Sequence, residues 1–163
     1  MRKELYNIIC DHLRTAVPAI RHIDLWNQNV EFIEQESAWP RPAVFVEFGP
    51  IAWKSIGGHE DCDLYRGQGT VSLHIVTDWT GSSDADSTTR ENCLSAYSLS
   101  EAIQSALLEY TDGEHYHALK LFQTVTSHNH EDLLECIDTY SVVATRRVPI
   151  EPVSDIEDEP SAT

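Results

Sequence analysis

Two short apolar runs, joined by a long connection, constrain the fold of this chain more than any other feature. The first covers residues 43–48 (Ala-Val-Phe-Val-Glu-Phe) and the second residues 69–78 (Gly-Thr-Val-Ser-Leu-His-Ile-Val-Thr-Asp). In the second run apolar and polar residues alternate, as they do in a strand with one buried face. In the first, Phe45 is apolar on the face opposite to Val44 and Val46, which predicts that another element or another subunit covers it. We therefore predict two central β-strands.

The connection between these strands, residues 51–68, is longer than most loops in compact domains, and loops of this length are often functional. It carries four large side chains that are too apolar for a purely solvated loop: Trp53, Ile56, Leu64 and Tyr65. Two interpretations stay open. The connection is either a hairpin arm that folds back on its own domain or an arm that packs on a neighbouring subunit. The second interpretation makes these four residues the candidate subunit interface.

Helix and strand patterns on both sides of this pair complete the predicted domain. Apolar residues recur at three- and four-residue spacing in residues 2–16 and again from about residue 88 to 110, which predicts two amphipathic helices. A short strand near Ile23 and further strands at 120–127 and 138–148 would complete the sheet. We expect one α+β domain over residues 1–148. It would have two layers: a mixed or mainly antiparallel sheet of four or five strands with a long hairpin arm, and two helices packed on one face.

Acidic residues dominate the charge of the chain, which is −16 overall. Residues 149–163 hold five acids, three prolines and no base, so we predict a disordered acidic tail. Residues 1–148 still carry 22 acidic side chains against 11 basic ones. Because such a surface repels phosphate, we expect no specific nucleic-acid binding, although DNA could slide past an acidic wall. The chain has no run long enough to cross a membrane and no signal-peptide pattern, so we expect a cytosolic protein.

Histidines give the best candidate for a metal site. Two His-x-His pairs have the spacing of metal ligands and lie close to two acidic residues that offer oxygen ligands: His115, His117, His128, His130, Glu131 and Asp132. Both pairs fall at expected strand ends or turns, where exposed polar residues are common. We therefore predict surface histidines, with no tightly bound metal and no cofactor.

Other catalytic patterns are absent from the sequence. Asp24, Glu47 and Asp78 are carboxylates whose spacing brings no two of them together, so an acid–base pair is not predicted. The chain has no GxSxG nucleophile elbow, no GxGxxG fingerprint and no P-loop. Its four cysteines, at positions 10, 62, 93 and 136, form no CxxC pair, and we predict reduced, mostly buried thiols. The residues indicate a protein that is not an enzyme.

The element order, with residues 42–48 entering the sheet and residues 71–76 returning, resembles a known family. Together with the opening helix that begins Glu-Leu-Tyr-Asn-Ile-Ile at residues 4–9, it looks like the tail-terminator and tail-completion proteins of long-tailed phages and prophages, the minor tail protein U-like family. The resemblance covers residues 1–148 and rests on the order of the elements and on the character of these short stretches, with no diagnostic motif. The acidic tail is not part of the pattern, and no functional residue of the family can be carried over.

The resemblance implies a structural role. Such proteins form rings, commonly hexamers, that cap the tail tube and join it to the head-side connector. The implied partners are therefore further copies of the chain, the tail tube protein and the connector, with DNA passing through the ring. The implied location is the host cytoplasm during assembly and then the virion tail. Alternatives are another head–tail joining (neck) protein, a monomeric or dimeric binding module, and a small metal-dependent enzyme that uses the two histidine pairs.

Overall fold

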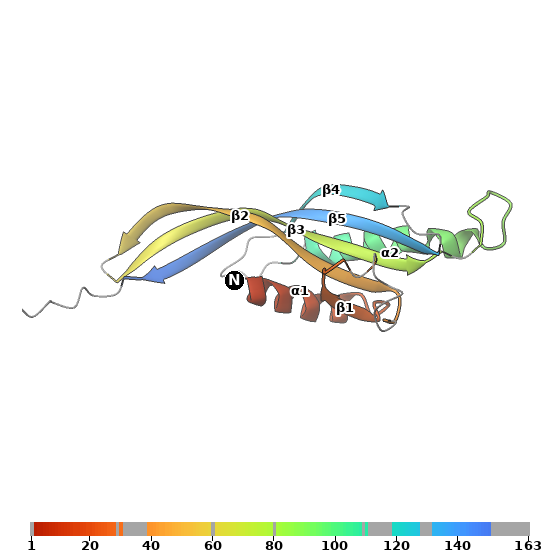
Figure 1. Cartoon of the computed structure of the whole chain (residues 1–163), viewed down its shortest axis with the longest axis horizontal. Coiled ribbons are helices and arrows are strands. Elements are labelled where there is room, and N and C mark those ends of the chain that lie inside the picture. Colours follow the sequence, from red (N-terminus) through yellow and green to blue (C-terminus); the bar gives the residue numbers. More distant parts are fainter. Residues whose placement is uncertain are drawn as a thin grey trace, which may run out of the picture.

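The computed structural model describes residues 2–28, 30, 39–59, 61–79, 81–108, 110, 119–127 and 132–150, and of His59 only the backbone. In that part of the chain two helices accompany a five-stranded sheet (Figure 1). The elements in chain order are α1 (Arg2–Ala16), β1 (His22–Leu25), β2 (Ala43–His59), β3 (Cys62–Asp78), α2 (Arg90–Leu108), β4 (Lys120–Ser127) and β5 (Leu133–Pro149). The strand order is β1-β2-β3-β5-β4. Only β1 and β2 are parallel, so the predicted mixed, mainly antiparallel α+β sheet is confirmed.

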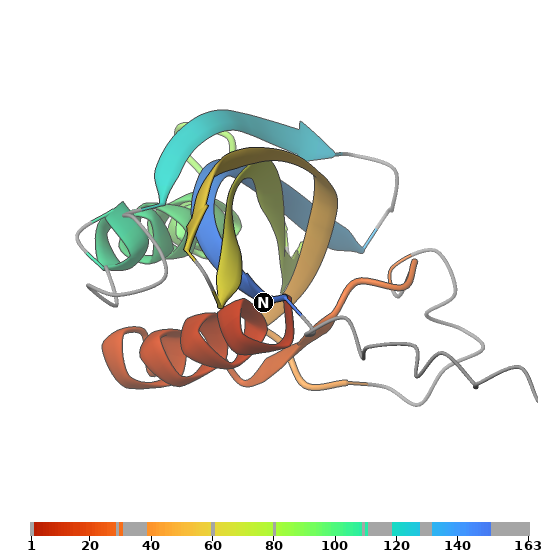
Figure 2. The same cartoon turned by 90° about the vertical axis from the view of Figure 1, so that its left-hand side faces the viewer.

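Both helices lie on one face of the sheet, as predicted (Figure 2). The buried stripe of α1 is Leu5, Ile9, Cys10 and Leu13, and that of α2 is Cys93, Ala96, Leu99, Ser100, Ile103 and Leu107. Both stripes meet the alternate residues of β3 that point the same way, Val71, Leu73 and Ile75. The helices also contact each other, because the Nε2 atom of His12 lies 2.9 Å from the carbonyl oxygen of Ala106. This layer forms the main apolar core.

The opposite face is covered near the start of β2 by the chain's own residues. Phe45 is fully buried there, and the ring centroid of Trp39 lies 4.9 Å from that of Phe45 in an edge-on arrangement. Trp26 and Val30 belong to the same small cluster. The element predicted to cover Phe45 is therefore the segment that leads from β1 to β2, and no second subunit is needed for that contact.

The predicted long hairpin arm is confirmed, but the prediction that the first strand ends at residue 48 is wrong. β2 continues through Phe48 to His59, and β3 begins at Cys62, so most of residues 51–68 lie in strands of one hairpin. β5 pairs with β3 along its whole length, from Asp78 opposite Leu133 to Cys62 opposite Pro149. Each of these three strands has 17 residues and would span about 55 Å if straight. β5 also begins five residues before the predicted strand.

Pro50 explains why the sequence pattern hides the continuation of β2. Proline lacks the N–H group that a strand needs, so Gly49 and Pro50 together predict the end of a strand. However, β1 pairs with β2 only as far as Val46, and no other described residue pairs with that edge of β2 beyond this point. The register also shifts by one residue between Phe48 and Ile51, which is a β-bulge. Open edges and bulges are the places where a strand tolerates proline.

Candidate interaction surface on the arm

The three long strands project beyond the helices as an arm, which we define as residues 50–59 of β2, 62–69 of β3 and 142–149 of β5 (Figure 1). The start of the arm is marked by Arg2, at the beginning of α1, whose Nη2 donates to the carbonyl oxygen of Gly49 at 3.2 Å. Beyond this contact neither helix covers the sheet. We call the rest of the sheet, with α1 and α2, the base.

Two glycines on β3 let large side chains of β2 lie flat on the arm. A Cβ atom at Gly67 would lie 2.8 Å from the Trp53 ring and 2.9 Å from Ile51. A Cβ atom at Gly69 would lie 2.7 Å from both the Ile51 side chain and the carbonyl oxygen of Pro50. These distances are too short for any residue with a side chain. The glycines therefore form the floor on which Ile51 and Trp53 pack, and their partners on β5, Val142 and Ala144, belong to the main apolar core.

The four residues predicted as an interface all lie on the arm, but on both of its faces. Trp53 packs over Gly67, and Tyr65 shares that face because it pairs with Ser55, two residues beyond Trp53. Leu64 precedes Tyr65 on the same strand and points the other way. Ile56 is the extra residue of a second bulge, between Ser55 and Gly57. Trp53 and Ile56 are 38% and 53% exposed, whereas Leu64 and Tyr65 are half-buried.

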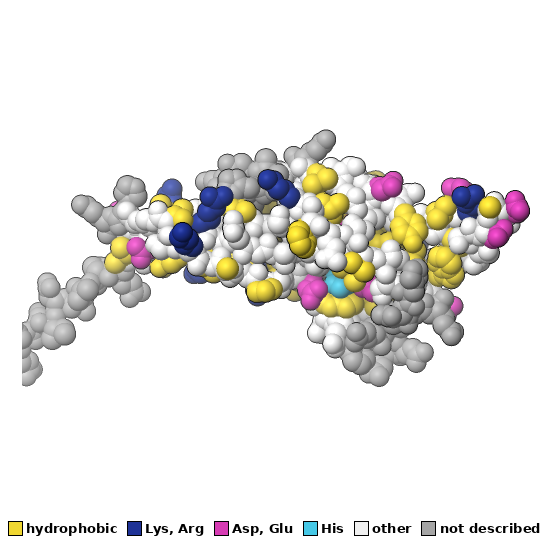
Figure 3. Space-filling view, turned by 90° about the horizontal axis from the view of Figure 1, so that it is seen from above, with side chains coloured by type: hydrophobic (Ala, Val, Ile, Leu, Met, Phe, Trp, Pro, Cys, Tyr) yellow, Lys and Arg dark blue, Asp and Glu magenta, His cyan; other side chains and the backbone are white. Residues whose placement is uncertain are grey.

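A shallow hollow of about 310 Å³ lies on the arm, lined by Ala52, Trp53, Lys54, Ile56, Arg66 and Gln68. Lys54 and Arg66 are directly opposite each other in the β2–β3 register. Arg147 pairs with Leu64 and Arg146 with Tyr65, so four bases lie within a few residues of each other. Figure 3 shows Lys and Arg side chains gathered over the arm end of the molecule. The arm thus combines exposed apolar groups with positive charge in a strongly acidic protein.

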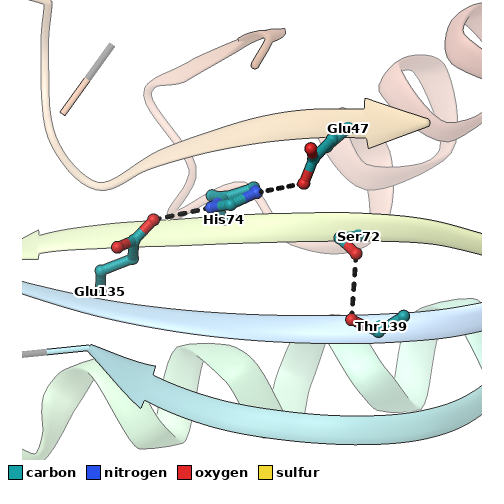
Figure 4. A network of polar contacts seen from close by, with 5 residues as sticks. All are labelled: Glu47, Ser72, His74, Glu135 and Thr139. Carbon is teal, nitrogen blue, oxygen red and sulfur yellow. Dashed lines mark hydrogen bonds and ion pairs between the residues drawn. The ribbon is translucent and has the colours of Figure 1, made fainter. Parts of the chain in front are cut away.

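A histidine held between two carboxylates braces the base (Figure 4). The Nδ1 atom of His74 lies 2.7 Å from Oε1 of Glu135, and its Nε2 atom lies 3.1 Å from Oε2 of Glu47. Which ring nitrogen donates depends on the tautomer of the imidazole. The Trp26 ring stacks on the imidazole, with 3.8 Å between the ring centroids and 2° between the ring planes. Because Glu47, His74 and Glu135 come from β2, β3 and β5, the contacts tie three strands together.

A second buried polar cluster surrounds Asp138 on the helix-facing side of β5. This carboxylate is fully buried and accepts three hydrogen bonds: from Ser100 Oγ at 2.7 Å, Gln104 Nε2 at 3.1 Å and Thr124 Oγ1 at 2.8 Å. The donors lie on α2 and β4, so the cluster fixes both elements to β5. Neither polar cluster was predicted. Alternation places His74 and Glu47 on one face of their strands, but only the register brings His74 diagonal to Glu135, which pairs with Val76.

The remaining candidates for chemistry are separated or lie outside the described residues. Asp78 pairs with Arg41, while Asp24 accepts from the Leu25 amide at 2.7 Å, so neither joins Glu47. His115, His117, His128, His130 and Glu131 lie outside the described residues. Among the residues that are described, no group of three His, Cys, Asp or Glu side chains could hold a metal ion. The metal prediction therefore stays a prediction.

Two of the cysteines and the buried Tyr140 have surroundings that oppose ionisation. All four cysteines are thiols, and three of them are buried: Cys10, Cys93 and Cys136. Burial raises the pKa of the Cys10 and Cys136 thiols, and the Asp138 carboxylate raises that of Cys136 further. Burial, followed by the charge of Asp138, also raises the pKa of Tyr140. These groups act as core side chains and not as activated nucleophiles.

Comparison with known proteins shows little that bears on function. No protein family and no curated protein matches the chain. One similar solved structure is described as "Virion of native gene transfer agent (GTA) particle"; the match covers 85% of each chain, with 11% identity and a TM-score of 0.38. A likeness this distant carries no argument about what the present chain does. No helix in the described part of the chain is long and apolar enough to cross a bilayer.

Proposed function

We propose that this chain is a structural subunit that assembles with copies of itself through the arm, in the manner of a phage tail terminator. The observation that carries the proposal is the arm itself. It extends beyond the helices and exposes Trp53 and Ile56 at 38% and 53%. Large apolar side chains gathered on an exposed surface usually mark an interaction site. Aromatic anchors in such sites often contribute about 2 kcal/mol or more to binding.

The resemblance in element order supplies the biological setting of the proposal. As a tail terminator, the ring would cap a tail tube and meet a head-side connector, with DNA passing through an acidic lumen. A neck protein at the same junction would use the same kind of contact. No catalytic role is assigned, because the buried polar clusters at His74 and Asp138 serve to join strands and helices.

The experiment compares the mass in solution of the parent chain with that of an arm variant, Trp53→Ser with Ile56→Ser. Multi-angle light scattering measures the mass, and circular dichroism checks the fold. We expect a parent oligomer and a smaller species for the variant, because the two most exposed apolar side chains of the arm are lost.

The matched control removes a second exposed apolar pair from the base edge, Phe122→Ser with Val125→Ser. These side chains of β4 are 72% and 43% exposed. We expect the control to keep the parent mass. If only the β4 variant dissociates, the contact lies on that edge and not on the arm. A parent that stays monomeric at high concentration would show that the isolated chain does not self-assemble.

A further inference from the structure

Within the described part of the chain, the basic residues of the arm have no carboxylate partner. Lys54 and Arg66 are opposite each other across two strands, an arrangement that destabilises a sheet because like charges repel. On the adjoining strand β5, Arg147 is opposite Leu64 and shares their face, whereas Arg146 is opposite Tyr65 and points to the other face. Among the described residues, none of these four side chains forms an ion pair with a carboxylate. An acidic partner would offset the repulsion between Lys54 and Arg66 in this chain of net charge −16.

The hollow beside these bases has mixed chemistry. Its walls include Ile56 and Ala52 together with the charged ends of Lys54 and Arg66. Such a site suits an extended acidic peptide that also carries a few aliphatic side chains. Cations bind carboxylates by charge-assisted hydrogen bonds, and the aliphatic groups cover Ile56.

The chain itself contains a segment with this composition. Residues 151–163 read Glu-Pro-Val-Ser-Asp-Ile-Glu-Asp-Glu-Pro-Ser-Ala-Thr, with five acids, two aliphatic residues of good size and no base. The segment starts at the arm, because Pro149 pairs with Cys62 and the Ile150 amide donates to the Asp61 carbonyl at 3.0 Å. Its charge is the opposite of that around the hollow.

The segment is also long enough. Arg66 lies four residues along β3 from Cys62, a distance of about 13 Å in a strand. An extended chain covers that distance in four or five residues, and thirteen are available. A short tether raises the effective concentration of a segment to the millimolar range, so weak contacts are enough to hold it.

We propose that residues 151–163 fold back along the arm of their own chain and occupy this hollow, with their carboxylates against Lys54 and Arg66. Exposed ion pairs are weak, at about 0–1 kcal/mol each, and salt screens them. The segment is therefore bound weakly and reversibly, and high salt displaces it. This inference does not depend on ring formation.

Lysine footprinting tests it on the full chain. The protein has three lysines, Lys3, Lys54 and Lys120. In one acylation experiment read by mass spectrometry, Lys3 and Lys120 therefore serve as internal references for Lys54. The test variant neutralises the segment by Glu151→Gln, Asp155→Asn, Glu157→Gln, Asp158→Asn and Glu159→Gln. We expect acylation of Lys54 to rise roughly threefold, as loss of about 0.6 kcal/mol of ion pairing implies, with Lys3 and Lys120 unchanged. High salt should raise Lys54 acylation in the parent and not in the variant.

A matched control removes the same number of charges elsewhere, at exposed acids of the base: Asp11→Asn, Asp86→Asn, Glu91→Gln, Glu101→Gln and Asp132→Asn. Lys54 should react in this control as in the parent. Equal Lys54 rates in parent, variant and control would overturn the proposal. So would a general rise at all three lysines, which would report net charge only.

A mixing experiment distinguishes binding of the chain's own segment from binding of another occupant. Isotope-labelled parent is mixed with unlabelled segment variant, and Lys54 is read separately in each. If the segment binds to its own chain, Lys54 of the variant is acylated as fast in the mixture as it is alone. If the parent protects it, the segment binds in a second copy, which overturns the proposal. Protection by an added DNA duplex that is stronger in the parent than in the segment variant would also overturn it. A monomeric parent, which would contradict ring formation, leaves this readout unchanged.

Discussion

The base and the arm are built from the same three strands but are stabilised in different ways. In the base both faces of β3 are covered, by the helices on one side and by Trp26 and Trp39 on the other. Its buried polar groups at His74 and Asp138 have hydrogen-bonding partners. In the arm one face packs on glycines, and the other carries bases without a carboxylate partner among the described residues. We therefore expect the base to hold more of the folding free energy than the arm.

The largest effect should follow from breaking the base at its buried carboxylate. Asp138→Ala leaves Ser100, Gln104 and Thr124 without their acceptor inside the protein. We expect a loss of about 3 kcal/mol in the free energy of unfolding, measured by urea denaturation.

The arm control for this change lies on the same strand. Arg147→Ala removes an exposed side chain from the arm part of β5 and should change stability by less than about 0.5 kcal/mol. If the two variants lose the same amount of stability, the base does not hold more of the folding free energy than the arm.

An intermediate effect should follow from filling the glycine floor of the arm. At Gly69→Ala the new Cβ atom would lie 2.7 Å from the Pro50 carbonyl oxygen, which is backbone and cannot move aside easily. We expect a cost of about 2 kcal/mol, typical of overpacking. Hydrogen exchange should speed up in residues 50–69 while the helices keep their protection.

The control for Gly69→Ala is a substitution at its exposed neighbour, Gln68. Gln68→Ala points to the other face of the same strand and should leave both stability and exchange rates nearly unchanged. If Gly69→Ala instead speeds up exchange equally in α1 and α2, the arm and the base unfold as one unit, and the distinction between them has no energetic meaning.

The smallest effect should come from deleting residues 151–163. The segment adds no apolar periodicity to the core, and ion pairs with exposed bases contribute little. We expect a change of less than about 1 kcal/mol in the free energy of unfolding, detected as a small shift in melting temperature. A large fall would mean that the segment is part of the folded core.

The sequence predicted the apolar layers of the base because their periodicities are strong. The stripes on both helices and the alternation around Val71, Leu73 and Ile75 predicted which faces are buried, and the structure agrees. The α+β class and the helices on one face followed from these patterns. Only the element that covers Phe45 was left open, because the segment between β1 and β2 has no clear periodicity.

The arm was harder to predict because its strands break the usual rules. Pro50 and four glycines between residues 57 and 69 read as turn signals, although the chain stays extended through bulges and an open edge. The His74 and Asp138 clusters were missed for a different reason. Their partners come from separate strands and a helix, and only the register of the folded sheet brings them together.

The length of the arm has a mechanical consequence. In the arm, β3 and β5 each contribute eight residues, which span roughly 26 Å. A rotation of about ten degrees about the start of the arm would therefore move its tip sideways by roughly 5 Å. Three hydrogen-bonded strands resist bending more than a single hairpin does. The arm should therefore rotate nearly as a rigid body. The arm therefore turns a slight tilt of the base into a larger displacement at its tip.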